Sequence, residues 1–65
     1  MADVAPELKR ILKGAGCYCE RKAKGDHERW FSPISRIRFM VDHCIKSRHT
    51  ANAVLKQAGL QKHFE

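Results

Sequence analysis

The sequence has no long hydrophobic run. Its 65 residues contain no stretch approaching the ~18 apolar residues that a membrane-spanning helix needs. Residues 1–6 lack the basic segment followed by an apolar segment that directs export. We therefore expect neither membrane insertion nor secretion, and a location in the cytoplasm.

Acidic residues are also few. The chain has 7 Asp and Glu against 13 Lys and Arg, which gives a net charge of +6. The acids are scattered, whereas a two-metal nuclease clusters several carboxylates, so we expect no metal-dependent mechanism and no cofactor. Residues 21–48 hold eight basic residues and three acids, a net charge of +5, which is typical of a polyanion-binding surface. A basic surface that serves only solubility is the alternative.

Cysteine is scarce and odd in number. Cys17, Cys19 and Cys44 predict no disulfide framework in a reducing compartment. Together with His43 they offer up to four zinc ligands, but Cys17 and Cys19 fall in a predicted strand, whereas structural zinc sites usually present their ligands on a turn. Small buried thiols in a core are the favoured interpretation, and no metal site is predicted.

The short length limits the kind of binding site. A chain of this size buries only about 60% of its unfolded surface. We expect one domain over residues 1–65. We also expect an open surface that binds a polymer or a partner protein, and no deep pocket.

Periodic apolar residues predict a helix at each end of the chain. The first covers residues 4–14, with Asp3 as the expected cap and with Gly14 and Gly16 as a stop. The second begins after Ser47 or Thr50 and is closed by Gly59.

Three segments between these helices have strand character. They are residues 17–22, 27–31 and 36–41, separated by turns at 23–26 and 32–35. The expected fold is α+β in the order α-β-β-β-α, a three-stranded antiparallel sheet with both helices on one face.

Alternation along the strands assigns the side chains to two faces of the sheet. The face expected under the helices carries Trp30, Ile37, Phe39 and Val41, and the open face carries His27, Arg29, Arg36 and Arg38. Phe31 does not fit this pattern, and marks a bulge, a strand end or a stacking platform for a base.

Cleavage of RNA without a metal needs a group that transfers protons near neutral pH and positive charge close to the phosphorus. His27 is the candidate catalytic residue, as general base or general acid. The candidate RNA-binding residues are Lys24, Arg29, Arg36, Arg38 and Lys46. His43 is either a second catalytic or positioning group or an ordinary loop residue, and no role is expected for His49 or His63.

A series of short motifs runs through the sequence: residues 7–12 followed by Ala15-Gly16, 25–27, 38–43, 45–46 and 54–60. Each motif is short, but together they cover nearly the whole chain. In order and spacing they resemble the HicA family of mRNA interferase toxins.

The resemblance implies a fold similar to double-stranded-RNA-binding domains, a toxin activity that cleaves mRNA, and a HicB-type antitoxin partner. The family's catalytic histidine stands in a Gly-Ser-His segment, which corresponds to Gly25-Asp26-His27. Asp26 replaces the usual serine, and residues 40–43 lack the proline of the family's Val-Pro-x-His segment. A non-catalytic RNA-binding module is the first alternative, and a small DNA-binding or scaffold protein is the second.

Overall fold

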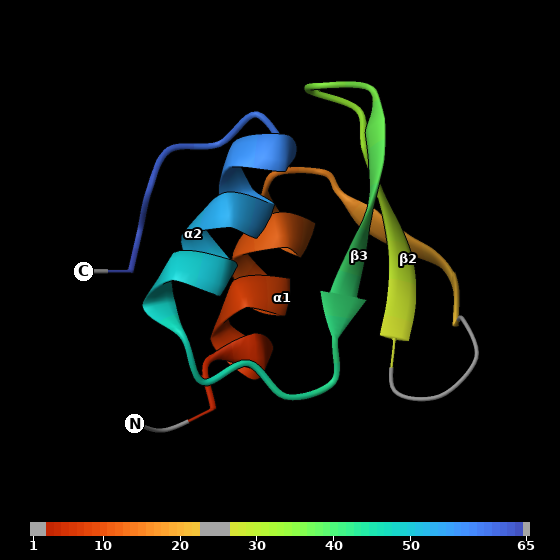
Figure 1. Ribbon diagram of the computed structural model, residues 1–65. Helices are drawn as coiled ribbons and strands as arrows, with labels where there is room; N and C mark the ends of the chain where they lie inside the picture. Colours follow the sequence, from red (N-terminus) through yellow and green to blue (C-terminus); the bar gives the residue numbers. More distant parts are fainter. Residues whose placement is uncertain (1–2, 23–26, 65) are drawn as a thin grey trace.

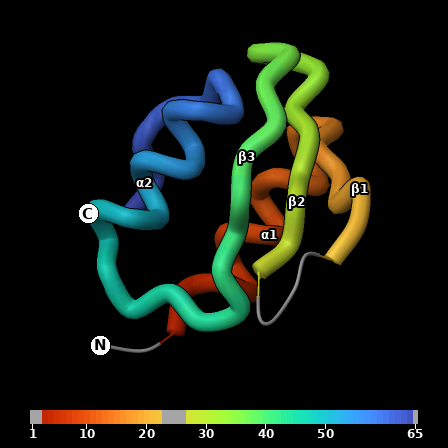
Figure 2. The backbone as a smooth tube through the Cα atoms, turned by 45° about the vertical axis from the view of Figure 1, so that its right-hand side comes forward, coloured from red at the N-terminus to blue at the C-terminus, as the bar shows by residue number. Residues whose placement is uncertain are grey.

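The chain forms two layers, a sheet and a pair of helices (Figure 1). The computed structural model describes residues 3–22 and 27–64. Its elements are α1 (Ala5–Gly14), β1 (Tyr18–Lys22), β2 (His27–Ser32), β3 (Ile37–Asp42) and α2 (Arg48–Gln57). The strands are antiparallel in the order β1-β2-β3, and both helices cover the same face of the sheet (Figure 2). The predicted α+β fold is confirmed, and no helix among the described residues is long and apolar enough to cross a membrane.

The core lies between the two layers. Trp30, Phe39 and Val41 are buried on the helical face of the sheet, as the alternation predicts. They belong to one cluster with apolar residues of both helices, chiefly Leu8, Leu12, Ala51, Val54 and Leu55. The prediction for Ile37 is wrong, because this side chain is 47% exposed. Ile37 is paired with Ser32 in the last register position of the hairpin, next to the turn.

The turn between β2 and β3 lies one residue later than the sequence predicts. Arg36 was expected to open the third strand, but it lies in the turn with a φ of 57°. Its backbone N–H donates to the carbonyl of Ser32 at 2.8 Å. The hairpin is therefore closed by the pair Ser32–Ile37.

Ser32 joins this turn to the C-terminal end of α2. Its side chain is fully buried, and its hydroxyl donates to the carbonyl of Ala58 at 2.6 Å. The same oxygen accepts from the backbone N–H groups of Ile34 and Ser35, and the hydroxyl of Ser35 donates to the carbonyl of Gln57 at 2.6 Å. The last carbonyls of a helix have no partner within the helix. The turn therefore supplies the donors that end α2.

Gly59 allows this close approach. It follows the C-cap residue Ala58 with a φ of 82°, so the predicted glycine stop is confirmed. A Cβ atom at this position would lie 2.9 Å from Cγ2 of Ile34 in the turn.

Asp3 anchors the N-terminal end of α1 to the segment that follows β3. Its Oδ1 accepts from the backbone N–H of Ile45 and from that of Ala5, each at 2.9 Å. These two hydrogen bonds hold the pKa of the Asp3 carboxyl below its usual value. The charged carboxylate therefore fixes where the chain leaves the sheet and turns toward α2.

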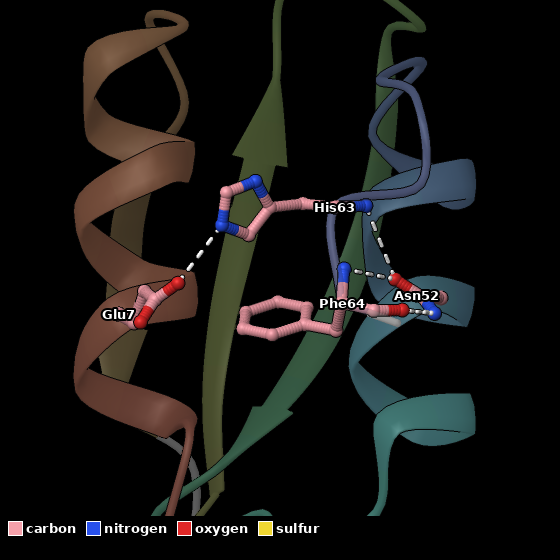
Figure 3. Close-up of polar contacts among 4 residues, drawn as sticks. All are labelled: Glu7, Asn52, His63 and Phe64. Atoms are coloured by element: carbon pink, nitrogen blue, oxygen red, sulfur yellow. Dashed lines mark hydrogen bonds and ion pairs between the residues drawn. The ribbon is translucent and has the colours of Figure 1, made fainter.

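The C-terminal segment crosses the helices on the side that faces away from the sheet (Figures 1 and 3). Oδ1 of Asn52 on α2 accepts from the backbone N–H groups of His63 and Phe64. The Phe64 side chain is buried, and Nε2 of His63 lies 2.8 Å from Oε2 of Glu7 on α1. Residues 63 and 64 thus link both helices.

We predict that Ser32→Ala lowers the free energy of unfolding by about 1–3 kcal/mol, because it leaves the buried carbonyl of Ala58 without a donor. Ser35→Ala is the matched control, and a smaller loss is expected because Gln57 is exposed and water can replace the hydroxyl. Urea unfolding measures both. Equal stability of Ser32→Ala and the unmodified protein would contradict the role of this hydrogen bond.

Candidate functional site

His27 and Asp42 face each other where β2 begins and β3 ends. They are register partners, and Nδ1 of His27 lies 2.6 Å from Oδ1 of Asp42. Both side chains are about half exposed, 53% and 49%. When Nδ1 carries the proton and its N–H donates a hydrogen bond to the carboxylate, Nε2 keeps its lone pair. This arrangement suits an imidazole that accepts a proton from a substrate.

Two arginines form the next feature along the open face. Arg21 on β1 is the register partner of Arg29 on β2, two residues from His27, and both are exposed. Like charges directly opposite each other destabilise a sheet. Neither arginine belongs to an ion pair formed within residues 3–22 and 27–64. An anion bound between them would relieve the repulsion.

A row of three side chains lies across the sheet beyond the arginines. Phe31 on β2 has Tyr18 of β1 as one register partner and Arg38 of β3 as the other. The rings of Tyr18 and Phe31 have centroids 5.7 Å apart, and Cζ of Arg38 lies 5.1 Å from the Phe31 centroid. Nε of Arg38 donates to Glu20 at 2.9 Å. The bulge that we considered for Phe31 lies instead in β1, between Cys19 and Arg21.

The remaining predicted site residues are not gathered in one place. His27, Arg29 and Arg38 lie on the open face, as expected, whereas Arg36 lies in the turn at the opposite end of the hairpin from His27. Lys46 is exposed in the segment before α2, and His43 is exposed directly after Asp42. Lys24 lies outside the described residues, as do Gly25 and Asp26.

Asp42 and Arg21 are site residues that the sequence pattern does not predict. The position of Asp42 opposite His27 can be recognised only when the register is counted from the closing pair Ser32–Ile37. Arg21 depends on the bulge in β1, which shifts the pairing so that Arg21, and not Glu20, opposes Arg29.

Glu28 supports the site from the helical face of the sheet. Its Oε1 accepts from Nε1 of Trp30 at 3.0 Å and lies 3.2 Å from Nζ of Lys9 on α1. The hydrogen bond from Trp30, aided by Lys9, holds the pKa of Glu28 below its usual value. The charged carboxylate therefore links the beginning of β2, next to His27, to Lys9 on α1.

The cysteines are dispersed in the structure. Cys17 is buried in the core, whereas Cys19 and Cys44 are exposed. Over the described ranges, no three His, Cys, Asp or Glu side chains come close enough together to hold a metal ion. A hollow of about 580 Å³ lies on the helical side of the molecule, away from His27, and is lined by Arg48, His49, Asn52, Lys62 and Phe64.

Comparison with known protein families identifies a family that matches most of the chain. The family described as the HicA toxin of bacterial toxin-antitoxin matches residues 5–60, which include every helix and strand of the structure. No curated protein and no solved structure matches the chain. The likeness to double-stranded-RNA-binding domains therefore stays a prediction.

We predict that Glu28→Gln makes unfolding less dependent on pH. The folded-state pKa of Glu28 is lowered, so its charge stabilises the fold at pH values above the ordinary pKa of the unfolded side chain. This contribution is lost as the pH falls through the lower folded pKa. The unmodified protein is thus expected to be the more stable at neutral pH and to approach the variant on acidification.

Urea unfolding between neutral and acidic pH tests this expectation. Glu20→Gln is the matched control, because Glu20 pairs with an exposed arginine on the open face, and such pairs contribute only about 0–1 kcal/mol. A stability difference for Glu28→Gln that stays constant down to the acid limit would rule out a role for its charge.

Proposed function

Because the chain belongs to the HicA family of bacterial toxin-antitoxin toxins, we propose that it is an endoribonuclease that cleaves mRNA with His27 as its catalytic residue. The observation that carries the proposal is the contact of 2.6 Å between His27 and Asp42 on the open face of the sheet. It gives an exposed imidazole a fixed orientation and a free Nε2.

The proposed reaction uses the 2′-hydroxyl group of the RNA. Nε2 of His27 takes the proton from this hydroxyl, and the 2′-oxygen attacks the adjacent phosphorus. The bond from phosphorus to the 5′-oxygen breaks, and the departing oxygen receives a proton from the imidazolium or from water. The products are a 2′,3′-cyclic phosphate and a 5′-hydroxyl. No step requires a metal ion.

Asp42 is a positioning residue in this proposal. Its carboxylate accepts a hydrogen bond from Nδ1–H, which favours the tautomer with Nε2 as the base and stabilises the imidazolium that forms. The aspartate acts through His27 and does not touch the substrate.

The open face provides the positive charge for an RNA backbone. Arg21 and Arg29, opposed and without an acidic partner among the described residues, are the proposed phosphate ligands nearest to His27. Arg38 and Lys46 are exposed and extend the basic surface. Lys24 and Arg36 remain proposed ligands on their charge alone.

A HicB-type antitoxin is the proposed protein partner in the cytoplasm. A surface rich in arginine and lysine attracts an acidic partner, and binding over His27 would block the reaction.

We predict that the toxin captures its HicB-type partner at low salt and releases it progressively as salt is added. A lack of capture at low salt would contradict this prediction. A complex in which the partner leaves His27 uncovered would contradict the proposed block of the reaction.

We predict that His27→Ala lowers the cleavage rate by about 10²–10⁴-fold, because it removes the proton acceptor. Asp42→Asn is expected to lower the rate less, and to have no further effect when combined with His27→Ala. The measurement is the appearance of fragments from a mixed mRNA in the presence of a chelator, on a denaturing gel.

His49→Ala is the matched control, because His49 is exposed on α2 and lies beside the hollow on the helical side. It should cleave as the unmodified protein does. Cleavage that survives His27→Ala would contradict the proposed role. Intact RNA with every version, together with a shift on a native gel, would favour the non-catalytic RNA-binding module.

A further inference from the structure

The row of Tyr18, Phe31 and Arg38 has no part in the proposed proton transfer. We propose that this cross-strand row stacks an unpaired base of single-stranded RNA and so holds the substrate beside His27. The inference rests on the proposed function for its choice of RNA as the ligand, and it adds the strandedness of that RNA.

The side chains of the row are of the types that stack with bases. Bases pack on aromatic rings and on the guanidinium plane of arginine without preference for one sequence. Tyr18 is 51% exposed and the side chain of Arg38 is 60% exposed. The cation–π contact with Phe31 and the hydrogen bond to Glu20 hold the Arg38 guanidinium in place. The row is therefore ordered before a base binds.

The fold alone does not account for aromatic rings at this position. The apolar face of the sheet is the other one, where Trp30, Phe39 and Val41 pack beneath the helices. Tyr18 and Phe31 lie on the face that no described element covers, next to charged residues. A stacked base would remove water from the rings while its phosphates stay near the arginines.

The distance between the row and His27 can be spanned by a short RNA strand. Phe31 is four residues further along β2 on the same face, a separation of about 13 Å at the usual rise of a strand. The opposed pair Arg21–Arg29 lies between them. A short extended strand could thus place a phosphate at His27, further phosphate at the arginines, and a base on the row.

Duplex RNA does not offer the same contact. Its bases are stacked on one another, and their faces are not available to side chains unless they are unpaired. The row therefore predicts a preference for single strands, or for unpaired bases in loops and bulges, over a continuous duplex.

The first test uses single-stranded RNA with 2′-O-methyl groups and one 2-aminopurine. This probe cannot be cleaved, because the attacking hydroxyl is blocked, so binding is measured apart from catalysis. The unmodified protein is expected to quench the 2-aminopurine fluorescence through stacking, and to bind the strand more tightly than a blunt duplex of the same sequence.

The second test compares variants of the row. Phe31→Leu keeps an apolar side chain but loses the ring, and Tyr18→Leu changes a largely exposed residue. Each should weaken single-strand binding by about 5- to 150-fold, and leave duplex binding unchanged. Phe31→Tyr keeps the ring and should retain the affinity. Urea unfolding verifies that the variants are folded.

The outcomes separate the two proposals. Stacking and ring-dependent binding without cleavage of ordinary mRNA would support the row and overturn the nuclease. Cleavage by a protein that binds duplex as tightly as single strands, or whose affinity is unchanged in Phe31→Leu, would overturn the proposed role of the row and leave the nuclease proposal standing.

Discussion

The hydroxyl of Ser32 is the contact on which the site depends. It is buried, donates to the last turn of α2 and accepts two backbone N–H groups of the hairpin turn. These bonds set the turn so that Ser32 pairs with Ile37, and the register of the whole hairpin follows. Because strand pairing is periodic, this register determines which residue of β3 meets His27 at the far end.

Three groups of side chains follow one another on the open face. The hairpin register brings Asp42 to His27 and Arg38 to Phe31. The pairing of β1 with β2, including its bulge, brings Arg21 to Arg29 and Tyr18 to Phe31. Each group has a different chemistry: an oriented imidazole, concentrated positive charge, and rings with a guanidinium. The helices leave this face open, so a chain too short for a deep pocket can still present these groups to an extended polymer.

The sequence predicts the fold well because its patterns are local. Apolar periodicity, the Ser47 cap and Gly59 define α2, and the alternation of Trp30, Phe39 and Val41 identifies the buried face. The site is less predictable because it depends on register. Strands ending at Phe31 and beginning at Arg36 would place Met40 opposite His27, whereas the closing pair Ser32–Ile37 places Asp42 there. The hydrogen bond of Ser32 to a helix 26 residues away cannot be read from local pattern.

The chemistry of the RNA ends tests the central claim most directly. Fragments produced by the purified protein in chelator would be analysed by mass spectrometry for their terminal groups. Attack by the 2′-oxygen, with His27 as the base, predicts 5′-hydroxyl ends and 2′,3′-cyclic phosphates or the 3′-phosphates formed from them. Fragments with 5′-phosphate and 3′-hydroxyl ends would mean that water attacks the phosphorus, and would contradict the mechanism.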